Sequence, residues 1–201
     1  MSYQEQDHFV AAAIVAAELY RAQIVAQEIT LTASNAKALA IRAGSSAAGF
    51  SALTDFIDEL ARKTIHTSQH VNRMAVEISK IVAQIARTES TLKHFEIACK
   101  RAADAEFINT IRPAQGRVQK EYDDMKLRFH EMVWKLKEEL NNIERELRTG
   151  VILSVMSRVE ATQAGAAHQT TLHAIAENVA SASGEIRRHV AQSQQRFAHI
   201  H

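Results

Sequence analysis

Residues that interrupt helices are scarce in this chain. Its 201 residues include one proline and six glycines, and aromatic residues make up 5% of the total. The hydrophobic residues, 46% of the chain, include many alanines. Alanine is the strongest helix former, whereas strands favour aromatic and β-branched side chains. Because so little opposes helix formation, the composition predicts an all-α protein.

The chain also lacks the features of several functional classes. A single cysteine, Cys99, excludes an intramolecular disulfide and a thiolate metal cage, and it suits a cytoplasmic location. The net charge is +1 and basic residues alternate with acidic ones, so we expect no nucleic acid partner. The N-terminus has no basic segment and the apolar run 10–17 is too short to span a bilayer. We therefore expect no signal peptide and no membrane insertion.

Glycine and proline positions divide the chain into four helical segments. Gly44 and Gly49 mark one turn, Pro113 and Gly116 a second, and Gly165 a third. The expected helices cover about residues 3–43, 50–110, 114–163 and 168–200. Two consecutive hairpins follow, 1–110 with its tip near 43–50 and 114–201 with its tip near 163–171. Together they predict a single elongated antiparallel four-helix bundle over 1–201.

Apolar residues recur along all four segments in alternating steps of three and four. The clearest seam, in the second segment, consists of Leu53, Ile57, Leu60, Thr64, Thr67, Val71, Met74, Ile78, Ile81, Ile85, Thr88, Leu92, Phe95, Cys99 and Ala102. The first segment is expected to bury Val10, Ala13, Ala17, Tyr20, Ile24, Gln27, Leu31, Ser34, Ala38 and Ile41. The last two are expected to bury Val118, Tyr122, Met125, Phe129, Met132 and Leu136, then Leu172, Ile175, Val179, Ala182 and Ile186. This period predicts near-parallel coiled-coil packing.

The first tip carries a pattern of small, basic and aromatic residues. It contains Asn35, Ala36, Ala40, Arg42-Ala43-Gly44, Gly49-Phe50, Asp55 and Leu60-Ala61. Over about 30 residues this pattern resembles, without gaps, the signalling tip of bacterial methyl-accepting chemotaxis receptors. The resemblance implies a helical hairpin that binds the chemotaxis histidine kinase, its coupling protein or other receptors. Physically, Gly44 and Gly49 can adopt positive φ, Phe50 can cover the core, and Arg42 can bind free carbonyls.

The second tip echoes the first. Gln163-Ala164-Gly165 matches Arg42-Ala43-Gly44, and the segments 50–57 and 172–179 share the pattern apolar, any, Ala, apolar, any, acidic, any, apolar. Receptor signalling domains are dimers of one hairpin, so two fused hairpins imply a monomer that mimics a receptor dimer. Two similar amphipathic hairpins would also arise without common origin. The residues expected to bind a partner are Ala38, Leu39, Arg42, Gly44, Gly49, Phe50, Glu160, Gln163, Gly165 and Leu172.

The tip also departs from the family pattern. Leu39, Ser45 and Ala48 stand where the family has charged residues, and Gln27 stands at its aromatic contact position. These changes make the tip more apolar, which points to a partner surface if the side chains are exposed. A hairpin with a purely structural role would need the same glycines and Phe50. The residues that match the family pattern therefore support the fold more than they support control of a kinase.

Other functions have less support in the sequence. A nucleophile–base set, a phosphate loop and a cofactor motif are all missing, so we expect neither an enzyme nor a cofactor. His66 and His70 are spaced to reach one metal ion, but no carboxylate completes the site, and solvated histidines are the favoured interpretation. Two alternatives remain: a structural coiled-coil adaptor, and a helical-bundle toxin component whose best membrane segment would be 151–156.

Overall fold

Four long helices make up the protein. The computed structural model describes residues 3–101, 110–164 and 166–198. The elements are α1 (Tyr3–Ala43), the short 3-10 helix η1 (Gly44–Ala47), α2 (Ala48–Arg101), α3 (Arg112–Gln163) and α4 (Ala166–Ala198). The described residues contain no strand, so the all-α prediction is confirmed. The expected seam residue Ala102 lies outside the described part of the chain.

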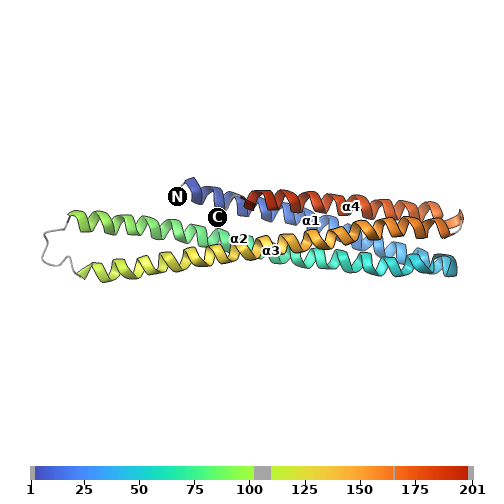
Figure 1. Ribbon diagram of the computed structural model, residues 1–201, viewed down its shortest axis with the longest axis horizontal. Helices are drawn as coiled ribbons and strands as arrows, with labels where there is room; N and C mark the ends of the chain where they lie inside the picture. Colours follow the sequence, from blue (N-terminus) through green and yellow to red (C-terminus); the bar gives the residue numbers. More distant parts are fainter. Residues whose placement is uncertain (1–2, 102–109, 165, 199–201) are drawn as a thin grey trace.

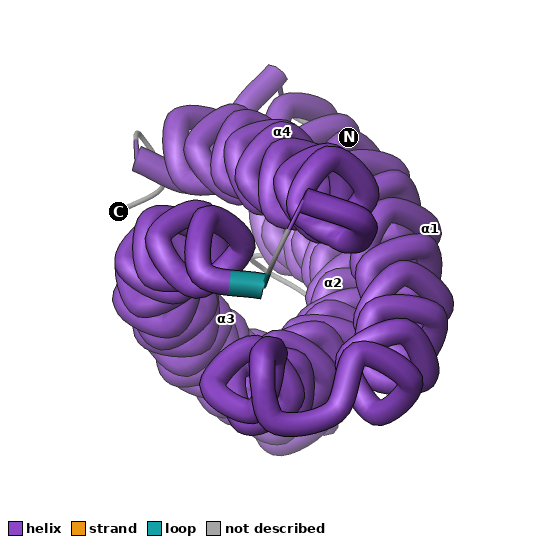
Figure 2. The backbone as a smooth tube through the Cα atoms, turned by 90° about the vertical axis from the view of Figure 1, so that its right-hand side faces the viewer, coloured by secondary structure: helices purple, strands orange, loops and turns teal. Residues whose placement is uncertain are grey.

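The helices run up and down along one rod (Figure 1). The α1–α2 turn and the adjoining ends of α3 and α4 lie at one end of the rod, the adjoining ends of α2 and α3 lie at the other, and the start of α1 and the end of α4 lie partway along it. Seen from the tip end, the helices form a ring in which each contacts its neighbours in sequence and α1 contacts α4 (Figure 2). This is the predicted antiparallel bundle, and α2 alone, at 54 residues, is about 80 Å long.

Four helices share a level only in the half of the rod that carries the tips. Stacking of His8 on Phe129, with ring centroids 4.9 Å apart, marks where α1 begins to cover α3. Beyond this level α2 and α3 continue as an antiparallel pair over 86–101 and 112–128, which we call the stalk (Figure 1). The bundle therefore differs from the uniform four-helix rod expected from sequence, because α1 and α4, at 41 and 33 residues, are shorter than their partners.

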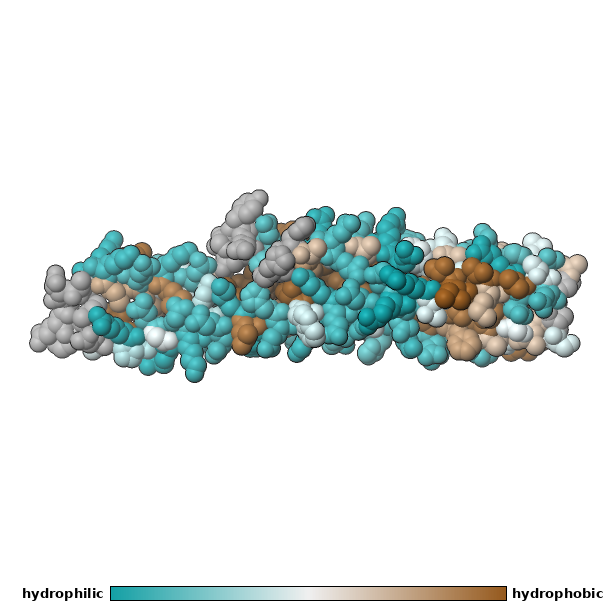
Figure 3. Space-filling model, viewed as in Figure 1, coloured by the Kyte–Doolittle hydropathy of each residue, from teal (hydrophilic) through white to brown (hydrophobic). Residues whose placement is uncertain are grey.

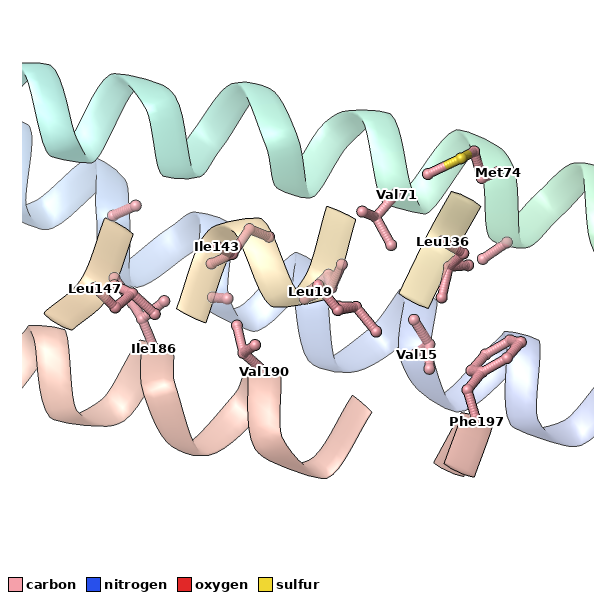
Figure 4. Packing of buried hydrophobic residues seen from close by; sticks show 14 of the residues in the cluster. Val15, Leu19, Val71, Met74, Leu136, Ile143, Leu147, Ile186, Val190 and Phe197 are labelled. Carbon is pink, nitrogen blue, oxygen red and sulfur yellow. The ribbon is translucent and has the colours of Figure 1, made fainter. Parts of the chain in front are cut away.

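The core of the four-helix region draws side chains from all four helices (Figure 4). Leu19 of α1, Val71 of α2, Leu136 of α3 and Ile186 of α4 are all buried and point into this shared interior. The predicted seams of α2, α3 and α4 face their neighbours and are buried or half-buried at every described position. For these three helices the heptad prediction is confirmed.

For α1 the predicted seam is wrong, because its residues face solvent. The helix instead buries Ala11, Ala12, Val15, Leu19, Ala22, Val25, Ala26, Ile29, Ala33, Ala36 and Ala40. The residues expected in the core form a continuous exposed row, which we call the outer stripe: Val10, Ala13, Ala17, Tyr20, Ile24, Gln27, Leu31, Ser34, Ala38 and Ile41. The buried face is mostly alanine, which lets α1 approach its neighbours closely, whereas bulkier residues are left outside.

Candidate functional site

The first tip is a tight turn built around one glycine. Gly44 follows the last residue of α1 and has φ of +68°, so its predicted conformation is confirmed. Gly49 lies inside α2 and has a different role: a side chain there would clash with the carboxylate of Glu160, whose Cδ would lie 2.6 Å from the new Cβ. Gly49 has no positive φ, so the conformation expected for it is wrong, and its lack of a side chain leaves room for the end of the Glu160 side chain between the two tips.

A small core joins the two tips. This tip cluster consists of Ala36, Ala40, Ala47, Phe50, Ala161, Ala164 and Leu172, with Leu39, Ala43 and Ile175 packed against it. Its members come from both hairpins, so the two tips converge as the internal repeat predicts (Figure 1). Phe50 and Leu172 are each 0% exposed, so they cover the end of the core and do not reach a partner directly.

The remaining predicted site residues surround this cluster. Ala38, Arg42, Gly44, Gly49 and Gln163 are exposed, whereas Leu39 and Glu160 are half-buried. Gly165 lies outside the described residues. Next to them, Lys37 of α1 and Asp55 of α2 form an exposed ion pair with a 2.5 Å N–O distance. The α1–α2 side of the tip therefore carries this ion pair next to exposed apolar residues, Ile41 at 66% and Phe56 at 56% exposed.

An exposed apolar surface lies on α3 close to the tips. The five residues Val151, Ile152, Val155, Met156 and Val159, which we call the α3 patch, are 43%, 61%, 48%, 49% and 54% exposed. They form a compact hydrophobic area near the tip end of the rod (Figure 3). Since α3 ends at Gln163, the whole patch lies within roughly 20 Å of the tip. Large exposed apolar patches commonly mark binding surfaces.

The structure also reveals a buried polar pair that the sequence analysis missed. His189 Nδ1 of α4 lies 2.6 Å from Glu18 Oε2 of α1, and the two residues are only 6% and 9% exposed. Arg21 Nη1 donates to the other Glu18 oxygen at 2.9 Å, and Ser193 Oγ donates to the His189 carbonyl. Beside Glu18, a groove of about 720 Å³ runs between α1 and α4. This pair fastens α1 to α4, the two helices absent from the stalk.

The buried face of α1, had it been predicted correctly, would have pointed to this pair. Glu18 lies between Val15, Leu19 and Ala22 on the face that packs inward. A carboxylate there needs a charged or hydrogen-bonding partner, because burying it alone is costly. Choosing the outer stripe as the seam placed Glu18 in solvent and removed the reason to search for a histidine on another helix.

Two further features bear on metal binding and on membranes. His66 is exposed and His70 half-buried, and the described residues contain no group of three His, Cys, Asp or Glu that could hold a metal ion. One helical segment, Asp7–Ala43, is long and apolar enough to cross a membrane by length and composition, with a mean hydropathy of 1.6. Core helices of soluble proteins can be equally long and apolar. In this helix, 44% of the apolar 18-residue window is buried in the bundle.

In comparisons with known proteins, no family model, no curated protein and no solved structure matches the chain.

Proposed function

We propose that this chain is a cytoplasmic protein-binding rod that engages signalling proteins through its paired hairpin tips. The partners that the tip pattern implies are a chemotaxis histidine kinase, its coupling protein or receptor signalling domains. In this role the chain acts as an accessory subunit of a receptor array, in which its own second hairpin replaces the second receptor chain. The activity is binding, without catalysis.

One observation carries the proposal: the α3 patch lies beside the place where the two tips converge. Its five exposed apolar side chains are on α3, at the same end of the rod as the tip segment 35–64, whose sequence resembles the receptor signalling tip. An interface there would combine an apolar centre with the exposed Gln163 at the end of the same helix. The exposed Arg42 ends α1, across the ring from α3, and would be a separate charged contact of the tip. Apolar centres with arginine anchors are typical of protein–protein interfaces.

The test is a binding measurement with purified kinase and coupling protein. Arg42→Ala should weaken binding by more than about 1 kcal/mol while leaving the melting temperature unchanged, because an exposed arginine contributes little to stability. Ile152→Asp, in the α3 patch, should weaken binding further. Arg73→Ala is the matched control, since Arg73 is an exposed arginine of α2 several turns from the tip.

Two results would reject the proposal. If neither the kinase nor the coupling protein binds the intact chain, the structural adaptor is the better interpretation. If Arg42→Ala lowers the melting temperature but leaves binding intact, Arg42 serves only to cap α1 and the tip is structural.

A further inference from the structure

The outer stripe of α1 is the largest unpartnered seam on the described surface. All ten of its residues are exposed, and its most exposed large hydrophobic residues, Leu31 and Ile41, are 67% and 66% exposed. The stripe repeats every seven residues from end to end of α1, which is the period of a coiled-coil seam. In a supercoiled bundle, residues seven apart keep the same direction relative to the rod, so the stripe offers one straight docking line.

We propose that this outer stripe binds the outer stripe of a second copy of the chain, with the two α1 helices antiparallel. The spacing of the stripe is symmetric about a point between Val25 and Ala26, so a two-fold axis through that point pairs every stripe residue with another. Such an interface is isologous and closes after two chains. This inference concerns α1 alone and does not depend on the proposed tip function. Each copy keeps its own four-helix bundle, so the assembly is a dimer of bundles in place of the monomer that the internal repeat implies.

Side-chain sizes match across this axis. Large residues meet large ones and small residues meet small ones, in the pairs Val10 with Ile41, Ala13 with Ala38, Ala17 with Ser34, Tyr20 with Leu31, and Ile24 with Gln27 of the second copy. At the small pairs the helices can approach closely, while the large pairs fill the layers between them. A random apolar face would not place its alanines and serine opposite one another in this way.

Charges on one border of the stripe match as well. Asp7, Arg21, Glu28 and Arg42 occupy the border positions that meet each other in an antiparallel coiled coil, and all four are exposed. The two-fold axis sets Arg21 against Glu28 of the second copy and Asp7 against Arg42 of the second copy, each pair occurring twice. A parallel pairing would instead set Arg42 against Lys37, two like charges. Electrostatics therefore selects the antiparallel arrangement.

A lipid surface is the competing occupant, because α1 is apolar enough in composition to cross a membrane. The outer stripe fits a bilayer less well than it fits a second helix. It contains Gln27 and Ser34, and Arg21, Glu28 and Lys37 flank it on both sides. A charge close to the hydrocarbon is costly, whereas the same charges are paired in the two-chain assembly.

Charge reversal provides a sharp test. We expect the intact chain to have twice the 22.4 kDa mass of one copy by light scattering. Arg21→Glu alone and Glu28→Arg alone should each weaken association at least tenfold, because each places like charges at two positions. An equimolar mixture of the two variants should restore the dimer, since every pair in the mixed dimer is then opposite in sign. Restoration also separates the effect from the contact of Arg21 with Glu18, which mixing cannot repair.

Cross-linking fixes the direction of the helices. In a Cys99→Ser background, Ala13→Cys and Ala38→Cys chains should be joined by a short bis-maleimide when mixed, and neither variant should cross-link alone. In the proposed dimer the two copies of residue 13 are about 37 Å apart along the axis. Reversal of Arg73, far from the stripe on α2, is the control and should leave the mass unchanged.

Three outcomes would overturn the proposal. A monomeric mass for the intact chain at all concentrations would show that the stripe does not pair. Cross-linking of the Ala13→Cys variant with itself would show a parallel arrangement. Binding of the monomer to phosphatidylcholine–phosphatidylglycerol vesicles, lost in Tyr20→Glu and Leu31→Glu, would assign the stripe to a lipid surface instead.

Discussion

The four-helix region and the stalk share one helix pattern but differ in how much they bury. The seam of α2 runs through both with unchanged spacing, yet Ile78 is 0% exposed in the four-helix region, whereas Leu92, Phe95 and Cys99 of the stalk are only half-buried. Two helices can cover one side of each seam residue, and four helices enclose it. A heptad pattern therefore shows that a helix has a partner, but it does not show how many partners it has.

Core truncation should give the largest difference between the regions. Leu140→Ala in the four-helix region should lower the free energy of unfolding by about 2–5 kcal/mol, because Leu140 is 0% exposed and its removal leaves a cavity. Leu92→Ala in the half-buried seam of the stalk should cost about 1 kcal/mol. Urea denaturation of both variants measures the two values. Equal losses would mean that the stalk is as well enclosed as the bundle.

Removing a polar pair should also cost more stability in the four-helix region than in the stalk. His189→Leu should cost roughly 1–3 kcal/mol in urea denaturation, because it leaves the buried Glu18 carboxylate with only Arg21 as partner. The double variant Glu18→Leu with His189→Leu should recover most of that loss. If the single and double variants are equally unstable, packing of His189 matters and its pairing does not.

The stalk provides the control pair. Lys100 Nζ lies 2.6 Å from Glu96 Oε1, and this hydrogen bond, with the nearby lysine charge, holds the pKa of Glu96 below its ordinary value. Both side chains are exposed, so Lys100→Ala should leave the melting temperature unchanged. A clear drop in melting temperature would show that the stalk depends on its surface charges more than the bundle does.

Glycine substitutions should give the smallest effects. Gly116→Ala in the stalk should stabilise the protein by up to about 1 kcal/mol, because a Cβ there has nothing within 4 Å and alanine favours the helix. Gly150→Ala in the four-helix region should show no such gain, since its Cβ would lie 2.6 Å from Leu60 Cδ2 and 3.3 Å from Ser183 Oγ. Melting curves of the two variants compare them. A gain at Gly150 would show that Leu60 has room to move.

Part of the tip structure was predictable from the sequence, and part was not. Gly44 indicated the turn, because few residues other than glycine tolerate positive φ. The internal repeat predicted that the two tips lie together, and they share one cluster of buried residues. Phe50 was expected both to cover the core and to belong to the partner surface, and Leu172 to belong to that surface. Both are buried in the tip cluster, since the same apolar residue can cover a core or meet a partner. The α3 patch was missed as a surface because the seam predicted for α3 ended at Leu136. Continued through Leu140, Ile143 and Leu147, the same spacing leaves the patch residues outside the seam.

The sequence by itself determined that the chain forms four helices, where α1 and α3 end at the tips, and which seams of α2, α3 and α4 face inward. The end expected for the second helix, near 110, lies beyond Arg101, the last described residue of α2. Helix propensity, turn residues and periodicity are local properties, and they agree in those segments. Only the tertiary structure decided which face of α1 is buried and that Glu18 meets His189. Two apolar stripes with equal periodicity compete on α1, and the choice depends on close packing of alanines against helices far away in the sequence. That information is carried by the neighbours of α1, so no inspection of α1 alone could supply it.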